Sequence, residues 1–155
     1  GVTWKDALSY AENFTYGGYS DWRLPDTKEL QSIVDYTRSP AKTNSASINP
    51  IFNCTQIKNE EGIKDYPWYW SSTTFSSGSP TNGASAIYIC FGRAMGYFGI
   101  LGWTDLHSAG CQRSDPKYSN FEGLTHKGDG YYNGNAPQGD AVRIFNYVRL
   151  VRNIN

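Results

Sequence analysis

Two helix starts lie close together near the N-terminal end of this chain, and strand-like runs follow later. This order of helices and strands limits the possible folds more than any other feature of the sequence. Thr3, with Asp6 three residues after it, has the spacing of a capping box. Apolar residues then recur at helical spacing, which predicts a helix over residues 4–13. Helices that precede a group of antiparallel strands indicate an α+β fold.

The second helix start lies in the segment GGYSDWRLPDTKEL, residues 17–30. Asp26 and Glu29 form another capping box there, and an apolar stripe predicts a helix down to about Tyr36. The DWRLP residues ahead of the cap are interpreted as a structural corner, since Trp22 can bury a large ring and a residue before proline is held away from the helical region.

Strand-like sequence fills much of the rest of the chain. WYWSSTTF (68–75) and ASAIYICFG (84–92) flank a polar SSGSPTNG linker, which predicts a hairpin. A further short strand is predicted within residues 93–103. The closing run AVRIFNYVRLVRN (141–153) is apolar on both faces, which predicts a central strand covered on both sides.

Length and charge exclude several classes of protein. A chain of 155 residues predicts a single domain, residues 1–155, with its own core. Fourteen basic and fourteen acidic residues cancel, so there is no electrostatic argument for a nucleic-acid partner. No apolar run approaches the roughly 20 residues of a membrane helix, so direct membrane insertion is not expected. The loop-rich composition suits a secreted or surface-displayed protein whose export signal lies outside this chain.

Three cysteines, Cys54, Cys90 and Cys111, permit one disulfide. The favoured pair is Cys90 with Cys111, which would close a loop of about 20 residues. Three unpaired buried thiols are the alternative. The lack of a CxxC pair disfavours a zinc site.

Several blocks of sequence together carry a resemblance to a known family. TWKDALSYAENF, GGYSDWRLPDTKELQSIVDY, INPIF, YWSSTT and YVRLVR resemble, in that order, the bacterial domain family named after the C-terminal domain of the Legionella collagen-like protein. The RLP and VRLVR pieces also resemble formylglycine-generating-enzyme-type domains. This resemblance implies a C-type-lectin-like fold with two helices, a small twisted antiparallel sheet and a long irregular loop region. It further implies attachment of a bacterial surface protein to carbohydrate or extracellular matrix.

The polar stretch 103–140 has almost no aliphatic residues and predicts a long functional loop. Its flat rings suit stacking on sugars, its amides suit hydroxyl groups, and its cations suit sulfate or carboxylate. The predicted ligand-binding residues are Trp103, His107, Arg113, Lys117, Tyr118, Tyr131, Tyr132, Asn133 and Asn135. We therefore expect an extracellular recognition or adhesion domain that binds glycans through this surface.

The same stretch is rich in the hard oxygen donors that calcium prefers. Asp129, Asn133, Asn135 and Asp140 make a candidate calcium site, although their spacing is not that of an EF-hand. Asx-turns can use the same side chains instead.

Two other classes of function stay open. The domain could be a structural or assembly module of a cell-surface protein, a homo-oligomer or a filament, because aromatic and arginine side chains are enriched at interfaces. An enzyme of formylglycine-generating type would need a reactive cysteine pair, and no motif surrounds Cys90 and Cys111. A catalytic triad would have to use His107 or His126 without a GxSxG elbow. We expect no catalysis.

Overall fold

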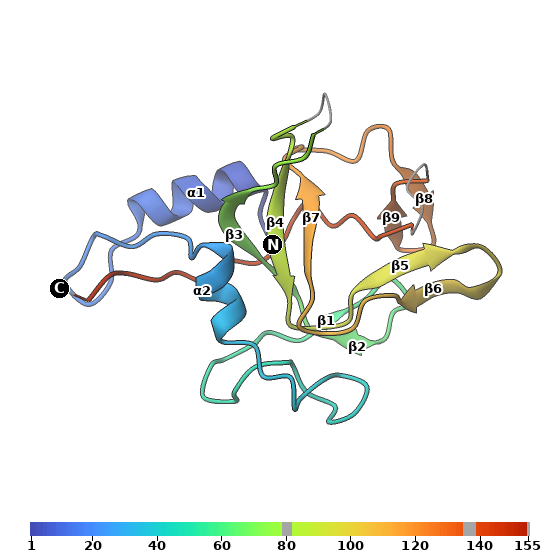
Figure 1. Cartoon of the computed structure of the whole chain (residues 1–155), viewed down its shortest axis with the longest axis horizontal. Coiled ribbons are helices and arrows are strands. Elements are labelled where there is room, and N and C mark those ends of the chain that lie inside the picture. The colour runs from blue at the N-terminus through green and yellow to red at the C-terminus, as the bar shows by residue number, and fades with distance from the viewer. Residues whose placement is uncertain (79–81, 135–138, 155) are drawn as a thin grey trace.

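Two short helices pack on opposite faces of a three-stranded antiparallel sheet (Figure 1). The computed structural model describes residues 1–78, 82–134 and 139–154. In chain order the elements are α1 (Trp4–Asn13), α2 (Thr27–Ser32), β1 (Ile57–Lys58), β2 (Lys64–Asp65), β3 (Trp68–Thr74), β4 (Ser85–Cys90), β5 (Met95–Phe98), the 3₁₀ turn η1 (Gly99–Leu101), β6 (Gly102–Asp105), β7 (Gln112–Pro116), β8 (Thr125–Lys127) and β9 (Gly130–Tyr132). The predicted α+β class is confirmed.

Strand β4 is the centre of the main sheet, with β3 on one side and β7 on the other. Both pairings are antiparallel, and Trp68 lies opposite Cys90 while Ile89 lies opposite Gln112. The predicted hairpin of residues 68–75 and 84–92 is therefore confirmed as β3 and β4.

Alternating side chains of β3 and β4 enter two separate cores. Trp68, Trp70 and Tyr88 pack with Ala7 and Ala11 of α1 on one face of the sheet. On the other face, Leu30 of α2 packs in a cluster with Ala46, Ile48, Tyr66, Tyr69, Ile89 and Phe91. Because successive side chains of a strand point to opposite faces, both faces of this sheet are buried.

The two helices differ in how well their ends follow the prediction. Helix α1 has the predicted bounds and begins at Thr3, whose side chain accepts a hydrogen bond from the Asp6 amide. Helix α2 begins at the predicted cap, Asp26, with both bonds of the capping box present, but it ends at Ser32. Val34 leaves the helix because it forms a β-bridge with Ile48.

The DWRLP corner is structural, as interpreted. Leu24 is buried in the α1 core. Arg23 donates to both oxygens of Glu29, at 2.7 Å each, and exchanges backbone hydrogen bonds with Val151. The corner thus joins α2 to the C-terminal segment.

Two predictions about strands and loops are wrong. Residues 103–140 are not one irregular loop, because β6, β7, β8 and β9 lie within them and β7 belongs to the main sheet. Residues 141–153 do not form a central strand. They run across several elements and make single bridges instead, with Val2, Tyr69 and Arg23 among the partners.

The predicted disulfide is not present as a bond. Cys90 and Cys111 are neighbours across β4 and the start of β7, but their sulfur atoms are 3.3 Å apart and both side chains are thiols. A disulfide needs about 2.05 Å. Cys54 lies elsewhere, beside the Tyr69 hydroxyl.

Candidate ligand-binding cavity

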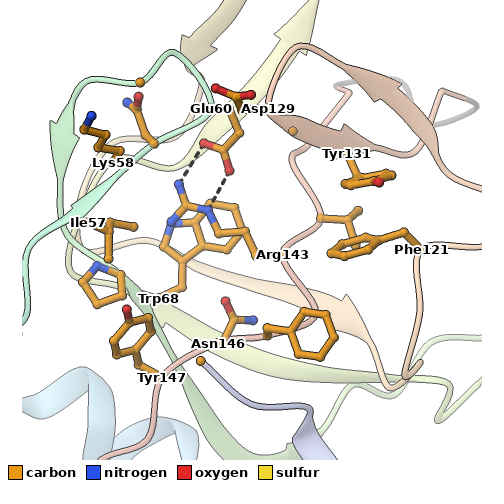
Figure 2. Close-up of a pocket in the computed structure, with 17 residues that line it drawn as sticks. Ile57, Lys58, Glu60, Trp68, Phe121, Asp129, Tyr131, Arg143, Asn146 and Tyr147 are labelled. Carbon is orange, nitrogen blue, oxygen red and sulfur yellow. Dashed lines mark hydrogen bonds and ion pairs between the residues drawn. The ribbon is translucent and has the colours of Figure 1, made fainter.

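A cavity of about 520 Å³ lies where segments far apart in the sequence meet (Figure 2). Residues 57–60, Gly62 and Tyr147 line one side, and Phe121 with residues 129–131 lines the other. Trp68 and residues 142–146 lie between them. Small-molecule sites in proteins have volumes of about 300–1,000 Å³, so this cavity has the size of a ligand site.

The floor of the cavity is a buried ion pair stacked on a tryptophan. Arg143 donates from Nε and Nη2 to the two carboxylate oxygens of Glu60, at 2.7 and 2.9 Å. Its guanidinium carbon lies 3.8 Å from the centre of the Trp68 ring, and Tyr88 stacks on Trp68 with ring centres 4.5 Å apart. Burial would lower the pKa of Arg143, but the Glu60 carboxylate outweighs it and raises this pKa. The Arg143 guanidinium therefore keeps its positive charge beside the Glu60 carboxylate.

A second polar layer lies beneath this floor. Asp115 of β7 is 1% exposed and accepts hydrogen bonds from the Arg143 amide at 3.1 Å and from Asn146 Nδ2 at 3.0 Å. Burial raises the pKa of Asp115 to about 7, and the hydrogen bonds from Asn146 and Arg143 only partly offset this. These contacts attach residues 143–146 to the main sheet.

Two polar atoms on these residues have hydrogen-bonding capacity left. Arg143 Nη1, a donor, and Asn146 Oδ1, an acceptor, are buried and have no partner among the described residues. A buried unpaired polar group costs about 1–3 kcal/mol, so both atoms favour any group that can pair with them.

The walls of the cavity are apolar and aromatic. Phe121 and Tyr131 stack with ring centres 4.0 Å apart, and Phe145 meets Phe121 edge-on at 5.7 Å. Ile57 and Tyr147 face them from the opposite side (Figure 2). The cavity thus combines two apolar walls with a hydrogen-bonding floor.

Of the predicted site residues, Tyr131 and Asp129 line this cavity. Phe121 covers one face of the Tyr131 ring, so that face is not available to a sugar. Trp103 and Tyr132 pack with Tyr97 in a separate ring cluster, in which Tyr97 and Tyr132 are 4.9 Å apart.

The other predicted residues are dispersed. His107 Nε2 lies 2.9 Å from Asp140, and Arg113 donates to the second oxygen of the same carboxylate. Lys117 lies 4.0 Å from the centre of the Trp4 ring and donates to Thr74. Two further residues, Tyr118 and Asn133, are exposed, and Asn135 lies outside the described residues.

The candidate calcium ligands do not converge in the described part of the chain. Asp129 lines the cavity, whereas Asp140 is paired with His107 and Arg113. Across residues 1–78, 82–134 and 139–154, no group of three or more His, Cys, Asp or Glu side chains is placed to hold a metal ion. Calcium binding stays a prediction, because Asn135 belongs to the set and falls outside those ranges.

Sequence reasoning missed the residues at the centre of the cavity, namely Glu60, Trp68, Arg143 and Asn146. Glu60 and Arg143 are 83 positions apart, and no local pattern connects them. The available signal was Arg143 itself, a charged residue within the apolar run AVRIF. A buried charge needs a partner, so an acidic residue from another segment was to be expected there.

The fold and the cavity together define a small α+β domain with a ligand-sized site. The chain belongs to the Lcl C-terminal domain family, whose model matches residues 1–104. This membership agrees with the resemblance found in the sequence and is consistent with a non-catalytic surface or assembly domain. Glu60 and Trp68 fall inside the matched range, whereas Phe121 and Arg143 lie beyond it.

No curated protein and no solved structure matches this chain. The C-type-lectin-like part of the fold prediction therefore has no structural neighbour to support it and stays a prediction. None of the helices in the described residues has the length and apolar character needed to cross a membrane.

Proposed function

We propose that this domain is a non-catalytic recognition module of a bacterial surface protein and that it binds a glycan in the cavity over the Arg143–Glu60 pair. The observation that carries the proposal is the combination of apolar walls and a polar floor in about 520 Å³. A pyranose ring has the matching character, because its C–H groups are apolar and its hydroxyl groups form hydrogen bonds.

The unpaired atoms at the floor favour a hydroxyl-bearing ligand. Arg143 Nη1 needs an acceptor and Asn146 Oδ1 needs a donor, and a hydroxyl group can act as both. Since both atoms are covered in the free domain, a sugar reaches them only when neighbouring side chains shift slightly. Hydrogen bonds to these previously unpaired groups would then make the free energy of binding more favourable.

The state of the cysteine pair supports a role without catalysis. Burial raises the pKa of Cys90 well above its ordinary value, and the neighbouring Cys111 raises it further. The thiolate is the nucleophilic form of cysteine, so Cys90 is held in its unreactive form at neutral pH.

A glycan array tests the proposal, with Phe145→Ala as the cavity variant and Phe52→Ala as its control. Both phenylalanines are about equally exposed, 43% and 40%, but only Phe145 lines the cavity. We expect the wild-type domain to bind a subset of sugars, and Phe145→Ala to weaken that binding about tenfold through lost contact area. Equal binding by the two variants, or no binding by the wild type, would contradict the proposal.

Calcium is part of the same proposal, because the predicted ligand Asp129 lies at the cavity. The array is therefore repeated with calcium and with a chelator. Weaker binding with the chelator is expected if calcium helps to hold the sugar, and unchanged binding would remove calcium from the account.

A second candidate function, assembly, is favoured by one observation. The β5–β6 hairpin projects from the body of the domain (Figure 1), and its tip exposes Phe98, Ile100 and Leu101, with Ile100 99% exposed. Exposed apolar groups of this kind mark interaction sites when they form a patch. If the tip joins copies of the domain, the double variant Ile100→Ser with Leu101→Ser will lower the mass measured by light scattering, whereas a wild-type monomer at every concentration would exclude this role.

A further inference from the structure

Resting on the proposed function, we infer that the cavity selects uncharged sugars over acidic ones and that Glu60 sets this preference. Glycans on cell surfaces include both kinds, and they differ in the carboxylate or sulfate groups that they carry. The inference depends on which charges at the cavity are already paired.

The formal charges of the side chains that line the cavity cancel. Lys58 and Arg143 are positive, and Glu60 and Asp129 are negative. The guanidinium of Arg143 has the planar geometry that usually recognises anions, but Glu60 already occupies its Nε and Nη2 donors. Two of the donors with which the guanidinium could bind an acidic sugar are therefore occupied within the domain, and Nη1 is the donor that has no partner among the described residues.

An acidic sugar would have to displace Glu60 to accept hydrogen bonds from both Nε and Nη2 of this guanidinium. The side chains of Glu60 and Arg143 are only 7% and 13% exposed, so a displaced Glu60 carboxylate would lose its partner in a poorly solvated place. Separation of a buried ion pair is strongly unfavourable, and the ligand's negative charge would then lie beside that of Glu60. An uncharged sugar leaves the pair intact.

Three basic residues that were predicted to bind a ligand do not line this cavity and have partners of their own. Arg113 and His107 are both bound to Asp140, and Lys117 lies against Trp4 and Thr74. Five basic residues of the predicted loop suit sulfate or carboxylate. These three each have an acidic, aromatic or hydroxyl partner inside the domain, whereas His126 and Lys127 are exposed.

The test compares matched sugars that differ only in a carboxylate. Glucose and galactose are titrated against glucuronic and galacturonic acid by ligand-detected NMR, with Phe145→Ala used to assign binding to the cavity. We expect the wild-type domain to bind each neutral sugar at least about tenfold more tightly than its acid, because the buried pair must open for the acid. Tighter binding of the acids would overturn the inference but leave the proposed function standing, whereas binding of neither kind would overturn both.

Glu60→Gln reverses the preference if Glu60 sets it. The glutamine oxygen can still accept a hydrogen bond from Arg143, while the positive charge of Arg143 is left uncompensated. We expect the ratio of neutral to acidic affinity to fall by about tenfold or more. Glu61→Gln is the matched control, since it removes one negative charge next to Glu60 from an exposed side chain that does not line the cavity, and the ratio should change by less than about threefold.

An unchanged ratio in a folded Glu60→Gln variant, or an equal change in Glu61→Gln, would contradict the role of Glu60. Circular dichroism shows whether the variant folds. If it does not, the wild-type comparison of neutral and acidic sugars still decides whether the cavity prefers uncharged ligands.

Discussion

Glu29 links two features at the corner of the domain. Its side chain accepts a hydrogen bond from the Asp26 amide and completes the capping box of α2. The same carboxylate binds both terminal nitrogens of Arg23. The hydrogen bonds from Arg23, followed by that from the Asp26 backbone, lower the pKa of Glu29 to about 2.

We predict that Glu29→Ala destabilises the domain by about 1–2 kcal/mol at pH 7, as expected for a lost cap and a solvent-exposed ion pair. Since the pKa of Glu29 is lowered on folding, its contribution is present above its ordinary pKa near 4.5 and is lost as the pH falls toward 2. Urea unfolding at pH 7 and pH 2.5 measures both effects.

The control for this prediction is Glu12→Ala, which removes an exposed glutamate from α1. It should change the free energy of unfolding by less than about 0.5 kcal/mol. A loss in Glu29→Ala that is equally large at pH 2.5 would show that the carboxylate charge is not responsible.

Asp115 has the opposite dependence on pH. Because burial raises its pKa from 3.8 to about 7, the folded state binds this proton more tightly than the unfolded state. The stability that Asp115 contributes is therefore greatest at pH values below about 4 and is lost as the pH rises to about 7.

We predict that Asp115→Asn removes this dependence. The free energy of unfolding of the wild type, minus that of Asp115→Asn, should fall by up to about 1.4 kcal/mol per pH unit between pH 4 and 7. Denaturant unfolding of both proteins across this range measures it. A difference that is constant with pH would mean that Asp115 is ionised throughout and that its hydrogen bonds outweigh burial.

At the scale of elements, the turn after β4 depends on a close backbone approach. A Cβ atom added at Gly92 would lie 1.9 Å from the carbonyl oxygen of Tyr66. That segment cannot move freely, since the neighbouring Asp65 is buried and accepts hydrogen bonds from the amides of Tyr66 and Arg93.

We therefore predict that Gly92→Ala destabilises the domain by more than about 2 kcal/mol, because the backbone must shift in a packed region. Gly78→Ala is the matched control, as its added Cβ meets nothing within 4 Å, and it should change stability by less than about 0.5 kcal/mol. Thermal unfolding followed by circular dichroism compares the two, and similar melting temperatures would contradict the prediction.

The elements that were predicted correctly are those determined by residues that are close together in the sequence. Helix α1 was predicted with its bounds because Thr3 and Asp6 determine its start locally. The prediction for residues 141–153 was wrong because the apolar residues of this run contact several elements in turn. Its apolar profile therefore does not mark a single strand of a sheet. The central, doubly covered strand is β4, whose residues Ala86 to Cys90 are all buried.

At the scale of the whole molecule, the cavity could be predicted only in part. Tyr131 was in the predicted ligand-binding set and Asp129 in the candidate calcium site, and both line the cavity. Arg143 and Trp68 were assigned to framework strands, yet they form its floor, because the C-terminal segment pairs with β3 at Tyr147 and places Arg143 over the Trp68 ring. Segments that are far apart in the sequence but meet in space produce no regular sequence pattern. Only the three-dimensional fold therefore reveals this cavity.

We propose that a sugar binds in the cavity over the Arg143–Glu60 pair. The most direct measurement is a titration of the ¹⁵N-labelled domain with the best neutral sugar from the array, followed by backbone amide chemical shifts. We predict that the largest shift changes fall in residues 57–62, 129–131 and 142–147. Changes confined to the His107–Asp140 region or to the β5–β6 tip, with the cavity unaffected, would contradict the account.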